Sequence, residues 1–231
     1  MCKPGAILAT NTSTLDIDQI ASATSRPADV IGMHFFSPAN VMPLLENVAG
    51  AASSDRALAT AQQLGKTLRK KAVLARNCFG FIGNRMLEPY MRESLYLLEE
   101  GCLPREIDAT LRAFGLAMGP LQVADLAGND IGYNIRRDMG WTDPETTPLK
   151  GERYWAGLAD ALVEQGRLGQ KAKAGWYDYS AGRAPVDDPA IEEMIVKHSA
   201  ALGIEVPGTH IQATCLLPLH APGAPMQSDA I

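Results

Sequence analysis

Two side chains in neighbouring apolar runs have the residue types needed for acid–base chemistry. His34 lies in the strand-like run 30–36, and Glu46 lies in the apolar stretch 42–48. A carboxylate inside an apolar strand is costly unless it is paired. If the two runs form neighbouring strands, Glu46 can hold the His34 imidazole in one tautomer and stabilise its cation, which makes His34 a competent general base. The alternative is a satisfied core histidine beside an edge-strand glutamate.

Two further segments place polar side chains where a ligand could bind. Residues 11–14, Asn-Thr-Ser-Thr, follow the first predicted strand, and open α/β sheets bind ligands at the carboxyl ends of their strands. The alternative for this segment is a plain helix N-cap, which the sequence alone favours more strongly. In residues 77–85, two glycines flank an aromatic at the start of a long predicted helix, where backbone can approach a ligand closely. Asn84 is a poor helix former that needs a partner, and packing between domains explains it about equally well.

Composition and missing motifs exclude several classes of function. The chain has 231 residues with 21 Lys+Arg against 26 Asp+Glu, a net charge of −5, and a hydrophobic content of 46%. These values are typical of a globular protein of one or two domains without a nucleic-acid or anionic-membrane surface. No apolar stretch approaches the roughly 18 residues of a membrane span. The four cysteines form no Cys-x-x-Cys pair and have no histidine at ligand spacing, so no metal site is expected. The first five residues lack a signal-peptide pattern, and we expect a cytoplasmic protein.

The hydrophobic pattern changes character near residue 76. Before that point, short β-type runs alternate with helical segments, which indicates part of an α/β sheet. The strands are expected at residues 6–10, 30–36, 44–48 and 72–75, and the helices at residues 14–23 and 55–65. These elements are fewer than in a free-standing α/β domain, so this part is interpreted as the end of a domain whose beginning is missing. Neither G-x-G-x-x-G, G-x-x-x-x-G-K-[ST] nor G-x-S-x-G occurs in the sequence.

Helices dominate after residue 76. The spacing of apolar residues from Phe79 to Leu98 predicts a long helix whose broad apolar face is buried between other helices. Pro89 lies inside this helix and should kink it. Further helices are expected at the positions marked by Pro104, Pro120, Tyr154 to Gly166 and Asp188-Pro189.

Seven segments carry a resemblance to a known family. They are Ala-Ile-Leu-Ala-Thr-Asn-Thr-Ser at 6–13, Gly-Met-His-Phe-Phe-Ser-Pro at 32–38, Leu-Leu-Glu at 44–46, Gly-Phe-Ile-Gly-Asn-Arg at 80–85, Met-Gly-Pro at 118–120, Asp-Leu-Ala-Gly at 125–128 and Gly-Arg-Leu-Gly-Gln-Lys at 166–171. In this order and at these distances they resemble the L-3-hydroxyacyl-CoA dehydrogenases of fatty-acid β-oxidation. The similarity is strongest to the dehydrogenase part of the multifunctional enoyl-CoA hydratase/dehydrogenase enzymes, and it covers nearly all of residues 5–200.

The resemblance implies NAD-dependent oxidation of an L-3-hydroxyacyl-CoA to the 3-ketoacyl-CoA. It places the catalytic histidine at His34, its partner glutamate at Glu46, and the active-site serine and asparagine at Ser13 and Asn84. In such an enzyme His34 takes the proton of the 3-hydroxyl while hydride passes from the same carbon to NAD, and Glu46 stabilises the imidazolium. Ser13 and Asn84 would hydrogen-bond the substrate oxygens.

The resemblance also assigns the cofactor contacts. Lys171 matches a family lysine that reaches the cofactor, Ser37 occupies a position that touches the nicotinamide end, and Ser13 completes the expected set. Ser37 stands where many members have asparagine, and the multifunctional branch resembles this chain there. Lys173-Ala174-Gly175 replaces a more glycine-rich turn. The N-terminal half of the family's NAD-binding domain, with its glycine-rich phosphate loop, is absent.

The expected fold is an α/β remnant of a Rossmann-type NAD-binding domain followed by an all-α domain like the C-terminal domain of 3-hydroxyacyl-CoA dehydrogenase. The expected boundaries are 1–76, 77–185 and 186–231, the last being a linker helix and the truncated start of a second helical domain. We expect the isolated chain to be weak or inactive because the phosphate loop is missing. An acyl-CoA substrate and a homodimer through the helical domain are the expected partners, without nucleic acid or membrane. The alternative function is a non-catalytic helical dimerisation or docking module.

Overall fold

The computed structural model describes residues 2–142 and 154–204. The chain divides into two compact units, residues 1–89 and residues 90–231, and each is described by itself.

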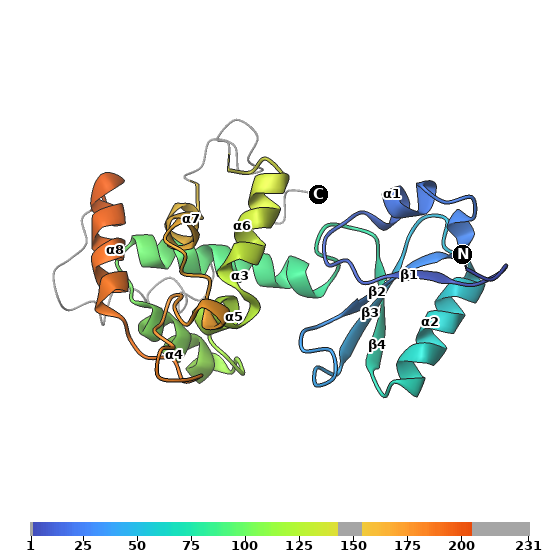
Figure 1. The fold of residues 1–231 in the computed structure, drawn as a ribbon, viewed down its shortest axis with the longest axis horizontal. Coiled ribbons are helices and arrows are strands. Elements are labelled where there is room, and N and C mark those ends of the chain that lie inside the picture. Colours follow the sequence, from blue (N-terminus) through green and yellow to red (C-terminus); the bar gives the residue numbers. More distant parts are fainter. Residues whose placement is uncertain (1, 143–153, 205–231) are drawn as a thin grey trace, which may run out of the picture. The chain divides into compact units, whose positions relative to one another are not determined.

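The first unit is built on a four-stranded sheet with strand order β1-β2-β3-β4 (Figure 1). The strands are β1 (Leu8–Thr10), β2 (Val30–Phe35), β3 (Leu44–Ala49) and β4 (Lys71–Arg76), and the helical elements are α1 (Ile17–Ser22), η1 (Pro27–Asp29) and α2 (Asp55–Thr67). Strand β1 runs parallel to β2, β3 runs antiparallel to β2, and β4 runs parallel to β3. All four strands and both helices predicted from the sequence are therefore present, in a mixed sheet.

The two faces of this sheet pack against different helices. On one face, Val30, Val48 and Ala75 pack with Ile17 and Ala21 of α1. On the other face, Ile31, Met33 and Leu45 pack with Ala61 of α2. Because successive side chains of a strand alternate between faces, His34 and Glu46 belong to the α1 side of the sheet.

The second unit consists of helices. Helix α3 (Gly83–Glu99) runs from the first unit into the second, and the others are α4 (Pro104–Phe114), α5 (Pro120–Ala127), α6 (Asn129–Asp138), α7 (Gly157–Glu164), η2 (Gln170–Ala172) and α8 (Pro189–Ala201). Helices α4, α5 and α8 each have proline in the first turn, where its missing N–H costs nothing. The Asp188 carboxylate accepts a hydrogen bond from the Ala190 N–H and caps α8, as the Asp-Pro pair predicted.

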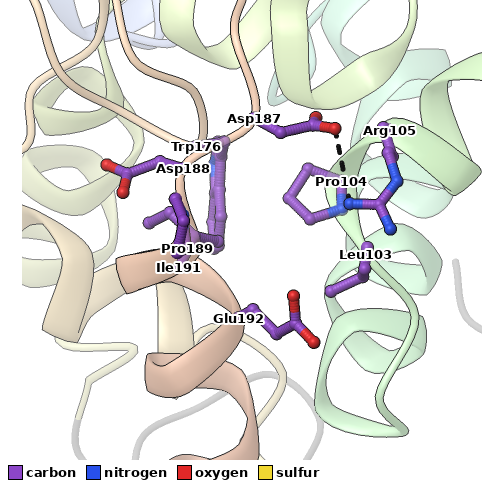
Figure 2. Close-up of a pocket in the computed structure, with 9 residues that line it drawn as sticks. All are labelled: Leu103, Pro104, Arg105, Trp176, Asp187, Asp188, Pro189, Ile191 and Glu192. Carbon is purple, nitrogen blue, oxygen red and sulfur yellow. Dashed lines mark hydrogen bonds and ion pairs between the residues drawn. The ribbon is translucent and has the colours of Figure 1, made fainter. Parts of the chain in front are cut away.

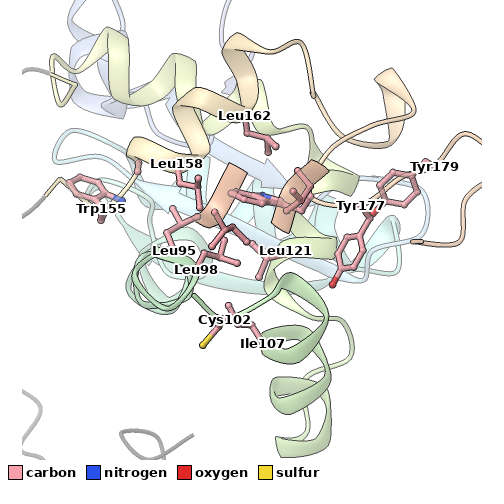
Figure 3. Close-up of a cluster of buried hydrophobic side chains, with 14 residues drawn as sticks. Leu95, Leu98, Cys102, Ile107, Leu121, Trp155, Leu158, Leu162, Tyr177 and Tyr179 are labelled. Carbon is pink, nitrogen blue, oxygen red and sulfur yellow. The ribbon is translucent and has the colours of Figure 1, made fainter. Parts of the chain in front are cut away.

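One apolar core holds this unit together (Figure 3). Its largest fully buried side chains come from four helices and from the segment after η2: Leu98, Leu121, Leu158, Leu162, Trp176 and Ile195. Burying a side chain of this size stabilises the fold by about 1.5–3 kcal/mol, so the packing of these residues decides whether the helical unit forms.

Two expectations for the helices were wrong in detail, and one helix was missed. Helix α3 begins at Gly83, and its N-terminal part is exposed, with Met86 at 70%. The expected burial holds for its second half, which includes Leu95 and Leu98. Tyr154 precedes α7 instead of lying inside it. Helix α6 was not predicted: Ile131 and Ile135 share one helix face, but the rest of its sequence is mostly polar and none of its residues is buried, so the signal is short.

Truncating the centre of the helical core tests this packing. Leu98→Ala should lower the free energy of unfolding by about 2–5 kcal/mol, because it leaves a cavity among fully buried side chains. Val196→Ala on α8 removes methyl groups from a side chain that is 49% exposed, and it should change stability little. Urea denaturation followed by circular dichroism measures both, and equal midpoints for the two variants would contradict this description of the core.

Candidate active site

His34 and Glu46 form a buried cross-strand pair. Strands β2 and β3 are neighbours, and their register sets His34 directly opposite Glu46. The His34 Nδ1 and Glu46 Oε2 atoms lie 2.7 Å apart, with His34 only 6% exposed and Glu46 fully buried. The pairing predicted from the apolar runs is confirmed. Because an ionised carboxylate can only accept, Nδ1 is the donor, and the lone pair of the neutral ring is on Nε2.

The second oxygen of Glu46 fixes the start of α3. Glu46 Oε1 accepts hydrogen bonds from the backbone N–H groups of Ile82, at 3.0 Å, and Gly83, at 2.8 Å. These N–H groups lie at a helix N-terminus, where a negative charge is stabilised. Asn84 is the next residue of α3. The carboxylate that orients His34 therefore also anchors the helical turn that carries Asn84.

Aromatic side chains enclose the imidazole. The Phe36 ring centroid lies 4.6 Å from that of His34, and the Phe81 centroid lies 5.8 Å away. A Cβ atom at position 83 would lie 2.7 Å from Phe36 Cζ, so any side chain there would push the Phe36 ring away from its present position. An apolar enclosure of this kind strengthens the electrostatic interaction between His34 and Glu46 because it keeps water away.

The segment after β1 is joined to the end of β2. The Asn11 side-chain oxygen accepts a hydrogen bond of 2.8 Å from the Phe35 N–H, next to His34 in the chain. The N-cap of α1 is Asp16, so the alternative that residues 11–14 serve as a plain N-cap is wrong. Among the described residues, neither the Ser13 hydroxyl nor the Asn84 amide makes a hydrogen bond to another residue, so both are available to a ligand.

The expected cofactor residues come from both units. Ser13 and Ser37 lie in the first unit, and Ser37 is exposed in the loop between β2 and β3. Lys171 lies in η2 of the second unit, where its Nζ atom is 2.5 Å from Asp130 Oδ1 and its side chain is 49% exposed. The hydroxyls of Ser13 and Ser37, close to the carboxyl ends of β1 and β2, fit the position that a dinucleotide takes on an open α/β sheet.

Two buried aspartates that the sequence analysis did not single out hold the segment with Lys171 in place. Asp125 accepts hydrogen bonds from the N–H groups of Trp176 and Tyr177, and Asp108 accepts from the Tyr177 hydroxyl. Burial raises the pKa of both carboxyl groups, and these hydrogen bonds oppose that shift. A Cβ at Gly175 would lie 2.0 Å from Asp125 Oδ1. A carboxylate in an apolar run, the signal that pointed to Glu46, was also present at Asp125.

A separate pocket lies in the second unit and has a volume of about 180 Å³ (Figure 2). It is formed where the N-terminal ends of α4 and α8 meet the Trp176 indole, and it includes the ion pair between Arg105 and Asp187. No predicted site residue lines it. Within residues 2–142 and 154–204 there is also no cluster of metal-ligating side chains, and none of the helices there is both long and apolar enough to cross a bilayer.

Comparison with known families identifies both units. Residues 1–78 match the NAD binding domain of 3-hydroxyacyl-CoA dehydrogenase, and residues 80–179 match the C-terminal domain of 3-hydroxyacyl-CoA dehydrogenase. The chain belongs to the 3-hydroxyacyl-CoA dehydrogenase family. Members of this family are NAD oxidoreductases, so the resemblance read from the sequence is confirmed. The fold is a Rossmann-like NAD-binding domain with a mixed sheet, followed by the family's helical domain.

Individual relatives place the chain within this family. It is 46% identical over 212 residues to the human peroxisomal bifunctional enzyme, a match that covers 89% of this chain and 29% of the relative. It is 34% identical over 218 residues to the fatty acid oxidation complex subunit alpha of Vibrio cholerae, covering 94% and 29%. The chain thus spans less than a third of the length of these relatives.

Solved structures agree with the fold. The (S)-3-hydroxybutyryl-CoA dehydrogenase of Ralstonia eutropha is 36% identical with a TM-score of 0.67, covering 77% of this chain and 62% of that one. The dehydrogenase part of multifunctional enzyme 1 from C. elegans is 32% identical with a TM-score of 0.59, covering 91% and 45%. These matches give no support to the expected weak activity or to the alternative of a non-catalytic module.

Glu46→Gln tests whether one carboxylate holds both His34 and α3. Glutamine offers a single carbonyl oxygen, which can accept from the α3 N–H groups only if its NH₂ group faces His34. The imidazole should then change from the Nδ1–H to the Nε2–H tautomer, because Nδ1 must accept from that NH₂ group. Nitrogen-15 NMR of histidine-labelled protein reads the tautomer directly.

The matched control for this substitution is Glu93→Gln, which makes the same change at a side chain that is 64% exposed. It should leave the His34 tautomer unchanged. An unchanged Nδ1–H tautomer in Glu46→Gln itself would show that Glu46 does not determine the protonation of His34.

Proposed function

We propose that this chain is the dehydrogenase part of an enzyme that oxidises L-3-hydroxyacyl-CoA to 3-ketoacyl-CoA in fatty-acid β-oxidation. The observation that carries the proposal is the buried His34–Glu46 pair, whose carboxylate also binds the start of α3. The printed functions of the relatives support it: fatty acid oxidation complex subunit alpha, and (S)-3-hydroxybutyryl-CoA dehydrogenase.

In this proposal His34 is the general base. Its Nε2 atom accepts the proton of the substrate's 3-hydroxyl, because Nδ1 is committed to Glu46. NAD, when bound, supplies the acceptor for the hydride that leaves the same carbon. The proton on Nε2 makes His34 an imidazolium. The Glu46 carboxylate, whose Oε2 lies 2.7 Å from Nδ1, stabilises that cation, and burial from solvent strengthens the attraction.

Ser13 and Asn84 position the substrate in this proposal. Each is partly exposed, and each has hydrogen-bonding capacity that no other described residue uses. Bonds from the Ser13 hydroxyl and the Asn84 amide to the reacting oxygen would align its carbon for hydride transfer. Ser13, Ser37 and Lys171 are the proposed contacts to NAD, and Asp130 holds the Lys171 ammonium in place.

We propose the first boundary that the sequence indicates, with residues 1–76 as the C-terminal part of a Rossmann-type domain and the helical domain beginning at residue 77. The end of β4 at Arg76, and family matches that meet between residues 78 and 80, support the first boundary. The absence of G-x-G-x-x-G from a chain that matches an NAD-binding domain supports the interpretation as a remnant. Helix α8 buries Ile191 and Ile195 in the helical core. We therefore assign α8 to the helical domain, although the sequence placed it in a linker within 186–231. Residues 205–231, proposed to begin a second helical domain, lie outside the described residues.

The same relatives support proposals for the substrate and the compartment. An acyl-CoA substrate agrees with the family, and a homodimer through the helical domain remains a prediction. Relatives from animals and plants are named as peroxisomal, which favours a peroxisomal setting over the cytoplasm expected from the sequence.

His34→Gln tests the proposed base. In the NADH-dependent reduction of acetoacetyl-CoA, followed by the loss of NADH absorbance, kcat should fall by about 10²–10⁴-fold because proton transfer loses its catalyst. His198→Gln is the control, since His198 pairs with Glu99 in the second unit and has no proposed catalytic role. Both are assayed in this chain and in a version extended at its N-terminus by the glycine-rich half of a family NAD-binding domain, which should raise turnover. An unchanged kcat in His34→Gln would remove His34 as the base.

A further inference from the structure

The loop between β2 and β3 has little apolar packing to hold its shape. Every residue from 37 to 43 is exposed, including Val41 at 68%. Within the loop, the N–H groups of Val41 and Met42 both donate to the carbonyl oxygen of Pro38, at 2.9 Å each. A segment with so few buried contacts opens easily, so its conformation depends on its hydrogen bonds.

A lysine from another part of the fold supplies two of these bonds. The Lys70 ammonium donates to the carbonyl oxygen of Ala39, at 2.5 Å, and to that of Met42, at 2.8 Å. No other donor in the described part of the chain reaches these two oxygens. Hydrogen bonds from a charged group are roughly twice as strong as neutral ones, so Lys70 is the strongest single restraint on the loop.

The backbone turn that follows α2 directs the Lys70 side chain toward the loop. Arg69 has a φ of 57°, a left-handed conformation that is unfavourable for a residue with a side chain. This turn brings the Lys70 N–H to the Gly65 carbonyl, at 2.9 Å, and the Lys71 N–H to the Pro43 carbonyl, at 2.8 Å. Backbone strain persists only where the surrounding structure enforces it, and here it directs a cation onto the loop.

The loop also determines where two residues beside His34 lie. Phe36, which packs against the His34 ring, immediately precedes it, and Ser37 is its first residue. A change in the loop conformation would therefore move the Ser37 hydroxyl and weaken the packing of the Phe36 ring against the His34 imidazole.

We propose that Lys70 is a positioning residue for the cofactor end of the site: its ammonium clamps residues 39–42, so that Ser37 is held where it contacts the nicotinamide part of NAD. The role of Ser37 rests on the proposed function, whereas the clamp itself does not. Lys70 touches neither substrate nor cofactor and acts through the loop.

Lys70→Met is the test, with Lys66→Met as the matched control. Lys66 is an exposed lysine in the last turn of α2, and its side chain makes no hydrogen bond or ion pair with another described residue. Hydrogen exchange of the Val41 and Met42 amides should become about tenfold faster in Lys70→Met and stay unchanged in Lys66→Met. Exchange at Val48 in β3 should be the same in all variants, which separates loop opening from global unfolding. Lys70→Arg, which keeps a charged donor, should restore much of the protection.

The functional consequence is measured by NADH fluorescence titration of the variants in the version of the chain extended by the glycine-rich half of a family NAD-binding domain. Lys70→Met should raise the Kd for NADH about five- to tenfold relative to Lys66→Met, and Lys70→Arg should recover part of the affinity. Unchanged amide exchange in Lys70→Met would overturn the clamp, whether or not the chain is a dehydrogenase. Faster exchange with unchanged NADH affinity would overturn the link from the loop to the cofactor. Failure of the unsubstituted extended protein to bind NADH would count against the proposed function, and the exchange measurement would still decide on the clamp.

Discussion

The arrangement of the site depends on one buried carboxylate that accepts three hydrogen bonds. Glu46 is completely excluded from solvent, and an isolated charge in that position would cost more free energy than a domain of this size can spare. The His34 imidazole and the N–H groups of Ile82 and Gly83 compensate that charge. Removing any one of these donors leaves part of the carboxylate unsatisfied. The orientation of the base and the position of α3 are therefore one structural requirement.

The register of β2 and β3 is what makes this arrangement possible. A slip of one residue would turn Glu46 to the α2 face, against Ile31, Met33 and Ala61, which offer no hydrogen-bonding side chain. The pairing of Gly32 with Val48 resists such a slip, because a Cβ at position 32 would lie 2.8 Å from Val48 Cβ and any side chain other than glycine would clash. The apolar packing of the sheet thus selects the one pairing in which the acid and the base meet.

Local sequence signals were sufficient for part of this site. An ionisable side chain inside an apolar strand must have a partner, and that argument identified His34 and Glu46 and correctly required adjacent strands. The position of residues 11–14 at the carboxyl end of a strand was likewise visible, although the sequence favoured the N-cap that Asp16 in fact provides. The family resemblance, not the spacing of residues, supplied the roles of Ser13 and Asn84.

Other features could not be read from the sequence because they depend on contacts between distant segments. The Glu46 bonds to α3 span 36 and 37 residues, and those of Asp125 to the segment after η2 span 51 and 52. Lys70 lies in a run of basic residues that is typical of a solvated surface, and only the fold shows that its ammonium reaches a loop some 30 positions earlier. Helix α6 has only a short apolar signal, Ile131 and Ile135 in a mostly polar sequence.

The most direct test of this account is a crystal structure of the protein with acetoacetyl-CoA and NAD bound. The account predicts that His34 Nε2 lies within hydrogen-bond reach of the substrate's 3-oxygen, about 2.6–3.2 Å, while Nδ1 stays bonded to Glu46. Ser13 or Asn84 should donate to the same oxygen. A complex in which the 3-oxygen lies far from His34, or in which Glu46 has left the imidazole, would contradict it.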